Sequence, residues 1–333
     1  MRALLPSLGL AALFAASFAN AADLVVYSAR NEQLVKPIFE RYEQETGLKI
    51  QYLTDREAPL MARLQAEGRR TQADLFITVD AGNLWQAGEL GLLRPVQSEL
   101  LSDAIPAHLR DPQNRWFGLS VRARTLIYNT ERLDPASLST YEALAEPEWK
   151  GRLCLRTSKK VYNQSLVASL IEAHGSAEAE RIVRGWVDNL AVAPFANDDD
   201  TILAVAAGRC DVAIVNTYYL GRLKRDRPEL PVTVFWPNQS EGERGVHVNV
   251  SGAGITTHAK RPEAAQAFLE WLASVPVQEK FAGENLEFPA REGVALDPLV
   301  EGWGPFRPDL INVSRAGALQ AEATMLMDRV GYR

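Results

Sequence analysis

Residues 24–27 read Leu-Val-Val-Tyr, a short apolar run that opens the segment deciding the fold. Apolar side chains in residues 34–42 recur at helical spacing, as they do in residues 58–66. Two more short apolar runs, residues 50–53 and 74–77, follow these helical stretches in turn. The resulting order, strand, helix, strand, helix, strand with short loops, predicts a parallel sheet covered by helices.

The same alternation begins again after residue 150. It predicts a second α/β unit, with apolar strands separated by stretches of helical spacing. The expected strands are residues 153–155, 211–215 and 232–235, and the expected helices are about 163–174, 178–189, 201–207 and 219–225.

Two extended stretches, residues 116–128 and 246–256, lie between these units and are expected to cross from one to the other. Helical spacing returns at residues 262–274 and 315–329. We therefore predict an α/β fold of two lobes, each a mostly parallel sheet flanked by helices, joined by two crossing hinge strands as a clam shell. The expected division is residues 23–121 plus about 250–300 for lobe 1, and about 122–249 plus 301–333 for lobe 2.

The N-terminus has the pattern of a cleavable signal peptide, predicted to span residues 1–22. Arg2 is followed by an almost wholly apolar stretch, residues 3–18, and then by Ala-Asn-Ala at residues 19–21. A membrane anchor is the alternative, but the apolar run is shorter than the roughly 20 residues that span a bilayer. The predicted location is the bacterial periplasm.

The overall composition is that of an ordinary globular protein, with 47% hydrophobic and 23% charged residues among 333. A formal net charge of −6 argues against a nucleic-acid partner. Separately, we expect the protein to be a monomer. Four histidines and two cysteines are too few for a typical zinc site. An oxidising compartment permits a Cys154–Cys210 disulfide, and two buried free thiols are the alternative.

Ligands of open parallel sheets bind beyond the carboxyl ends of the strands, beside helix N-termini. That rule selects a cleft rich in tyrosine and arginine. The candidates after the predicted strands are Arg30, Asn31, Glu32, Asp80, Tyr162, Tyr218 and Tyr219, with Arg122 on the first crossing strand.

Phenolate oxygen is a hard anionic donor that suits a hard, highly charged cation such as Fe(III), whereas softer divalent ions favour His or Cys. Tyr162, Tyr218 and Tyr219 would together neutralise a trivalent ion. Arg122 or Arg30 could then hold a small anion such as carbonate through a two-pronged contact. The alternative for a Tyr-Tyr pair near a strand end is simple packing.

No motif indicates an enzyme, because G-x-S-x-G, H-E-x-x-H and a phosphate-binding glycine loop are all absent from the sequence. Three successive aspartates, residues 198–200, precede a predicted helix. They lack the spaced oxygen ligands of a calcium loop, so we expect them to cap the helix at Thr201.

The chain resembles the periplasmic ferric-ion-binding proteins that supply ABC importers, in particular their tyrosine-rich subgroup. The resemblance covers nearly the whole mature chain. Its carriers are residues 215–219 (Val-Asn-Thr-Tyr-Tyr), 162–166 (Tyr-Asn-Gln-Ser-Leu), 73–82 and 26–30. The Tyr-Tyr pair after an apolar strand is the most specific of these motifs.

The resemblance implies that Tyr218, Tyr219 and Tyr162 are iron ligands and that Arg122 assists the anion or the ligands. Many members of the family continue the opening motif with His-Tyr, but this chain has Asn31 and Glu32 there. It therefore has no histidine ligand from this loop, and Glu32, an anion or water could occupy the vacant coordination position.

The predicted function is capture of ferric iron in the interlobe cleft and delivery to an inner-membrane ABC permease. One alternative keeps the fold and binds a small anion, for which Arg30, Arg122 and helix N-termini are suited, or another solute. A secreted metal-dependent enzyme, with Asp80 or Glu32 as the base, is the other alternative.

Overall fold

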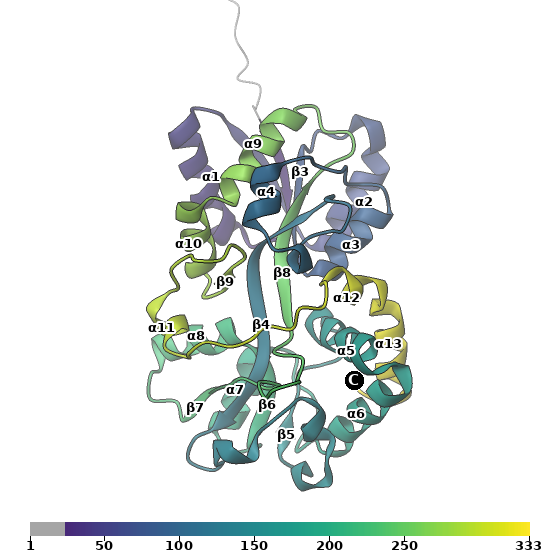
Figure 1. Cartoon of the computed structure of the whole chain (residues 1–333), viewed down its shortest axis with the longest axis vertical. Coiled ribbons are helices and arrows are strands. Elements are labelled where there is room, and N and C mark those ends of the chain that lie inside the picture. Colours follow the sequence, from purple (N-terminus) through teal and green to yellow (C-terminus); the bar gives the residue numbers. More distant parts are fainter. Residues whose placement is uncertain (1–23) are drawn as a thin grey trace, which may run out of the picture.

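The computed structural model describes residues 24–333, so the predicted signal peptide lies outside the described residues. Two α/β halves are stacked along the long axis of the molecule, and two long strands run between them (Figure 1). These are β4 (Phe117–Asn129) and β8 (Val248–Ile255), which pair antiparallel. Both expected crossing strands, residues 116–128 and 246–256, are thus confirmed as strands.

Lobe 1 is built on the three strands expected near the N-terminus, β1 (Leu24–Ser28), β2 (Ile50–Thr54) and β3 (Leu75–Val79). They are parallel in the order β2-β1-β3, and β8 adds antiparallel to β3. The helices of this half are α1 (Glu32–Thr46), α2 (Glu57–Glu67), α3 (Ala81–Glu89), α4 (Glu99–Ala104), α9 (Pro262–Leu272) and α10 (Val275–Gly283).

Lobe 2 contains the parallel pair β5 (Leu153–Cys154) and β6 (Val212–Asn216). The second half of β4 pairs antiparallel with β6 and with β7 (Val232–Phe235). Its helices are α5 (Val161–His174), α6 (Ser176–Asp188), α7 (Asp198–Ala206), α8 (Thr217–Asp226), α12 (Ser314–Ala318) and α13 (Gln320–Arg329).

The remaining elements are short and lie in connections. They are β9 (Phe288–Pro289), α11 (Pro298–Glu301) and the 3₁₀ turns Gly68–Arg70, Ala107–Leu109, Pro135–Ser137, Glu142–Ala145 and Pro147–Trp149. None of the helices formed by residues 24–333 is long and apolar enough to cross a membrane.

Several helices of lobe 2 begin earlier than the apolar spacing predicts, because their first turns are polar or aromatic. Helix α7 begins at Asp198, and Asn197 rather than an aspartate provides the cap by accepting from Asp200 N at 2.7 Å. The predicted capping of Thr201 by residues 198–200 is therefore wrong. Their carboxylates occupy the first turn instead, where negative charge is favoured.

The predicted helix over residues 315–329 is divided at Leu319 into α12 and α13. Helix α12 packs on α3 of lobe 1, and α13 packs on α5 and α6 of lobe 2. A β-carbon at Gly317 would lie 2.6 Å from Cβ of Trp85, so only glycine permits this approach of α12 to α3. The C-terminal helices therefore touch both halves of the molecule, as Figure 1 shows.

Each half has its own apolar core. One core gathers side chains from β1, α1, β3 and α9. A second lies around β5, β6, α5 and α6, and a third lies between α7, β6 and α8. The exact residue boundaries expected for the two lobes remain a prediction.

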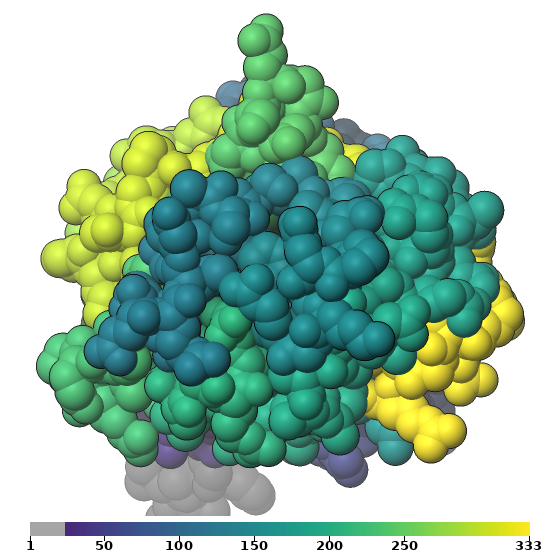
Figure 2. Space-filling model, turned by 90° about the horizontal axis from the view of Figure 1, so that it is seen from below, coloured from purple at the N-terminus to yellow at the C-terminus, as the bar shows by residue number. Residues whose placement is uncertain are grey.

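Seen from below, the face of lobe 2 is formed by the middle of the chain in teal, with the C-terminal segment in yellow along one side (Figure 2).

Cys154 and Cys210 form a disulfide in lobe 2, which decides between the two alternatives left open by the sequence. The bridge joins the end of β5 to the residue before the turn into β6, across a sequence separation of 56. It ties together the neighbouring strands whose carboxyl ends carry the tyrosines described next.

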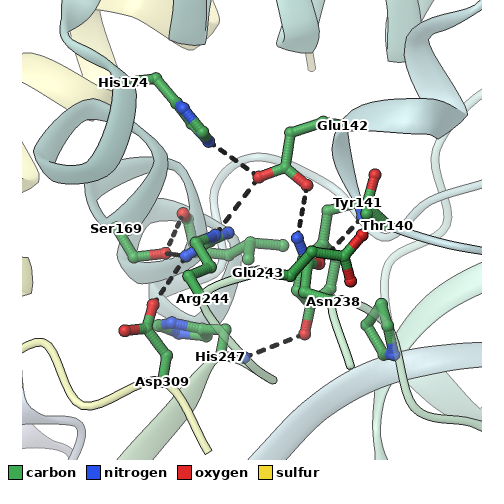
Figure 3. A network of polar contacts seen from close by, with 12 residues as sticks. Thr140, Tyr141, Glu142, Ser169, His174, Asn238, Glu243, Arg244, His247 and Asp309 are labelled. Atoms are coloured by element: carbon green, nitrogen blue, oxygen red, sulfur yellow. Dashed lines mark hydrogen bonds and ion pairs between the residues drawn. The ribbon is translucent and has the colours of Figure 1, made fainter. Parts of the chain in front are cut away.

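The hinge is fastened to lobe 2 by Arg244, which precedes β8 (Figure 3). Its Nη1 donates to Asp309 Oδ2 at 2.8 Å and to Ser169 Oγ at 3.3 Å, and its Nε donates to Glu142 Oε1 at 3.2 Å. Because Asp309 belongs to a further segment passing between the halves, this network holds two interlobe connections to one body. His174 Nε2 lies 2.9 Å from the same oxygen of Glu142.

Candidate metal centre

The three tyrosines predicted as ligands stand in the first turns of two helices of lobe 2. Strand β6 is fully buried, and α8 begins directly after Asn216, which places Tyr218 and Tyr219 in its first turn. Tyr162 is the second residue of α5, not just before the helix as the apolar spacing predicts. Both helices present unpaired backbone N–H groups and the positive end of their dipole to this region.

Tyr218 and Tyr219 lie against each other, with ring centroids 4.4 Å apart and planes inclined by 34°. Tyr218 is buried, with 3% of its surface exposed, and Tyr219 is half-buried. Asn216 Nδ2 donates to the Tyr218 hydroxyl at 3.2 Å. The strand end thus orients one phenol directly.

The three hydroxyls interact with one another. Burial raises the pKa of Tyr218 well above its usual value, and the phenols of Tyr162 and Tyr219 raise it further, against the opposing charge of Arg122. Burial and Tyr162 likewise raise the pKa of Tyr219. Tyr218 and Tyr219 therefore keep their protons until a cation enters beside them, because adjacent phenolates repel.

Arg122, predicted to assist the site, lies beside these phenols. Its guanidinium carbon is 5.0 Å from the ring centroid of Tyr162, and Nη2 donates to Val250 O at 2.9 Å. Burial alone would lower its pKa, but the charges of Tyr162 and Tyr218 help to raise it above the ordinary value. Its buried Nε has no hydrogen-bond partner among the described residues, so a donor is free for an anion.

Three further cations surround the tyrosines, and the sequence did not single them out. Lys160 Nζ lies 4.7 Å from the ring centroid of Tyr162. The Arg222 guanidinium lies 4.9 Å from the Tyr218 ring and 5.2 Å from the Tyr219 ring. Arg156 approaches Tyr162 at 5.7 Å. Arg156 and Lys160 could have been found because they follow a predicted strand. Arg222 could have been found because it lies one turn of helix after Tyr218.

A buried hydrogen-bonded layer lies beneath the tyrosines. Arg124 donates from Nε to Asn163 Oδ1 at 3.0 Å and from Nη1 to Asn216 Oδ1 at 3.1 Å. These asparagines adjoin the helix starts that carry Tyr162 and Tyr218. One buried guanidinium therefore links the two helix N-termini.

A small cleft opens between this layer and the crossing strands, lined by Arg122, Arg124, Tyr162, Asn216, His247 and Asn249. Burial lowers the pKa of His247 to about 3, and the charges of nearby Arg244 and Arg124 act in the same direction. Its ring is therefore neutral at physiological pH. This histidine is another residue of the cleft that the sequence did not single out.

Asp80, from lobe 1, meets lobe 2 at this point. It is the N-cap residue of α3, buried, and its Oδ1 accepts from Gly82 N at 2.8 Å. Both of its carboxylate oxygens lie 3.0 Å from Ser165 Oγ on α5. Burial raises its pKa, although Arg122 opposes the shift. Asp80 thus joins the helix of lobe 1 to the helix that carries Tyr162.

The other candidates of lobe 1 have partners of their own. Arg30 is buried, and its Nη1 pairs with Glu287 Oε2 at 3.1 Å. Asn31 caps α1 by accepting from Gln33 N, and Glu32 is exposed and accepts from the Tyr52 hydroxyl at 2.9 Å. No contact described by the structure joins Glu32 or Arg30 to the three tyrosines, so their roles at the site remain predictions.

Among residues 24–333, no group of three or more His, Cys, Asp or Glu side chains is arranged to hold a metal. The donor set of the cleft is instead three phenols ringed by four cationic side chains. Such a set can bind a hard, highly charged cation once its protons leave, and an anion beside it.

A model of the bacterial extracellular solute-binding proteins matches residues 38–306, and this chain belongs to that family. It is 41% identical to iron uptake protein A2 of Synechocystis sp., over 95% of this chain and 91% of that protein. It is 27% identical to the Fe(3+)-binding periplasmic protein of Serratia marcescens, over 90% of each chain.

Solved structures of such proteins have the same fold. The Trichodesmium protein IdiA (FutA), in complex with iron and citrate ligands, is 44% identical and superposes with a TM-score of 0.89, covering 93% of this chain and 99% of that one. The ferric binding protein of Campylobacter jejuni is 38% identical with a TM-score of 0.85, covering 93% of this chain and 100% of that one. The predicted two-lobed fold and the resemblance to ferric-binding proteins are confirmed.

Proposed function

We propose that this chain captures ferric iron in the periplasm, through the phenolates of Tyr162, Tyr218 and Tyr219, and delivers it to an ABC permease. The observation that carries the proposal is the placement of these three phenols at two helix N-termini, with Tyr218 against Tyr219 and Arg156 beside the rings of both Tyr162 and Tyr219. All three belong to lobe 2, so the set exists on one rigid body and lobe 1 closes over it.

The charges favour a trivalent ion. Three phenolates carry three negative charges, which one Fe(III) neutralises, and phenolate oxygen is the hard donor that this ion prefers. Without the ion, burial and mutual repulsion hold the protons on Tyr218 and Tyr219. Binding therefore exchanges protons for metal, and acid would favour release.

The relatives support iron as the cargo. Their names describe iron uptake and ferric binding, and the Trichodesmium structure holds iron with citrate. An anionic co-ligand, such as carbonate, fits the unpaired Nε of Arg122. Arg30 is the weaker candidate for that anion, because Glu287 already neutralises it.

The family and the predicted signal peptide support delivery to an inner-membrane permease and a periplasmic location. Proteins of this family bind solutes outside the cell, and the relative from Serratia is named as periplasmic. A binding role, rather than catalysis, agrees with these names.

The test is the visible phenolate-to-iron charge-transfer band that appears when ferric citrate is added to the apo protein. Tyr218→Phe combined with Tyr219→Phe should abolish the band and the binding of iron. Tyr52→Phe is the matched control, since Tyr52 is a tyrosine of lobe 1 hydrogen-bonded to Glu32, and it should retain both. A band that survives the double change removes the pair from the site.

Binding of a small anion without metal is the second candidate, and one observation favours it: four cations surround the phenols, with buried Nε atoms of Arg122 and Arg156 unpaired among the described residues. Thermal unfolding with carbonate, phosphate or citrate alone distinguishes the two. We expect ferric citrate to raise the midpoint much further than any anion alone. An equal shift with an anion alone would favour the second candidate.

A further inference from the structure

Arg156 lies directly after β5 and contacts two tyrosines that come from different helices. Its guanidinium carbon is 5.7 Å from the ring centroid of Tyr162 on α5 and 6.0 Å from that of Tyr219 on α8. No residue of the predicted site spans these two helices in this way.

The side chain is fixed from below by a buried carboxylate. Arg156 Nη1 lies 3.3 Å from Asp198 Oδ2, and Arg124 Nη1 lies 3.5 Å from the same oxygen. Asp198 is fully buried in the first turn of α7. The guanidinium is therefore paired on one side and turned toward phenols on the other.

The backbone of Arg156 is held as firmly. Its carbonyl accepts from Asn163 Nδ2 at 2.9 Å and from the Tyr332 hydroxyl at 2.7 Å. Asn163 follows Tyr162 in the chain and also accepts from Arg124. Arg156 is thus fixed at both its backbone and its head group, and every partner named here belongs to lobe 2.

The other three cations near the phenols are placed differently from Arg156. Arg122 stands on the strand that crosses between the lobes, Lys160 is half-buried, and Arg222 is exposed. Arg156 is the one of these four cations whose described ring contacts reach a tyrosine of α5 and a tyrosine of α8.

We infer that Arg156, supported by Asp198, is a positioning residue that holds Tyr162 and Tyr219 in register to share one ion. The inference rests on the proposed function and adds a residue to its site. The guanidinium acts through the two phenols and does not itself bind the metal.

The charge of Arg156 does not change iron binding simply by attracting the phenolates or repelling the ion. Three protons leave the phenols and one trivalent ion enters, so the net charge facing the guanidinium is the same before and after. Its Coulomb contribution to the exchange largely cancels, and the two ring contacts remain. Loss of an outer partner of this kind lowers metal affinity by about 10- to 100-fold.

The experiment compares Arg156→Gln with wild type, in ferric citrate titrations that record both iron affinity and the wavelength of the charge-transfer band. We expect affinity at least about tenfold lower and a shifted band, because the phenolates no longer meet the ion in the same orientation. Arg209→Gln is the matched control. It removes a guanidinium of lobe 2 that lies 5.5 Å from the Phe195 ring, and it should change neither quantity.

Removing Arg156 alone leaves Asp198 with a weaker partner in the interior, which could prevent folding. Arg156→Gln combined with Asp198→Asn removes both charges and should fold while still showing the weak affinity and shifted band. Arg156→Lys retains the charge but not the two-pronged head group, and it should restore affinity only in part.

The inference would be overturned if any folded variant, Arg156→Gln, Arg156→Lys or the double change, kept the wild-type affinity and band position. A wild-type protein that shows no band at all would instead overturn the proposed function and this inference with it. The two failures are therefore distinguishable within one set of titrations.

Discussion

The rings of Tyr218 and Tyr219 lie 4.4 Å apart although the residues are adjacent in one helix. Neighbouring residues of a helix normally point about 100° apart and do not face each other. Here both rings extend from the first turn of α8 on the same side, and Arg222, one turn later, covers both. The arrangement brings two hydroxyls to the third, on Tyr162.

Tyr162→Phe should weaken ferric binding by roughly 100-fold or more, equivalent to about 2.8 kcal/mol, because it removes one of three anionic donors. The residual charge-transfer band should be weaker and shifted. Titration with ferric citrate measures both, with Tyr52→Phe as the control. Unchanged affinity would exclude Tyr162 as a ligand.

Ser165→Ala should destabilise the folded protein by about 1–3 kcal/mol, because buried Asp80 loses the hydroxyl that contacts both of its oxygens. Urea unfolding of the apo protein measures the change. Ser102→Ala, at a half-buried serine of α4, is the control and should have little effect. Equal stability of the two variants would show that the link between α3 and α5 contributes nothing.

Reduction of the Cys154–Cys210 disulfide should lower the free energy of unfolding by about 4 kcal/mol, as expected for a closed loop of this length. The double change Cys154→Ser with Cys210→Ser should have the same effect. Urea unfolding with and without reductant tests this for wild type, and the double variant should not respond to the reductant. A wild-type protein equally stable in both conditions would contradict the prediction.

The contribution of Glu142 to stability should depend on pH. Burial alone would raise its pKa, but Arg244, Asn238 and His174 outweigh burial and lower the pKa below 4.5 (Figure 3). The unfolded chain therefore takes up this proton first as pH falls, so the stabilisation is complete above about pH 4.5 and is lost as pH falls through the folded pKa.

Glu142→Gln tests that dependence, because it removes the charge and keeps the shape. The difference in unfolding free energy between wild type and variant should be largest at pH 7 and shrink toward pH 3. Glu148→Gln, at an exposed glutamate of the 3₁₀ turn Pro147–Trp149, is the control. A difference that is constant with pH would contradict the account of this network.

Short apolar strands and helical spacing were sufficient to predict the order of the elements in both halves. The reason is that buried strands such as residues 212–216 contain almost only apolar residues, whose pattern survives without tertiary information. The first residues of the helices were predicted less accurately. First turns such as that of α8 carry residues of the cleft, so they lack the apolar spacing that identifies a helix packed on the core.

The tyrosines could be selected from sequence because each follows a strand end, which the topology brings to one edge. Arg156 follows β5, so the strand-end rule could have selected it, but its pairing with Asp198 depends on the packing of α7 beneath β5. Glu32 was selected by its position in the opening loop. Its hydrogen bond with Tyr52 is a tertiary contact, which a local sequence pattern does not predict.

The most direct test is a crystal structure of the iron-loaded protein, with anomalous diffraction measured at the iron edge. We predict a single strong peak within bonding distance of the hydroxyl oxygens of Tyr162, Tyr218 and Tyr219. A peak elsewhere in the molecule, beyond bonding distance of these three oxygens, would contradict this assignment.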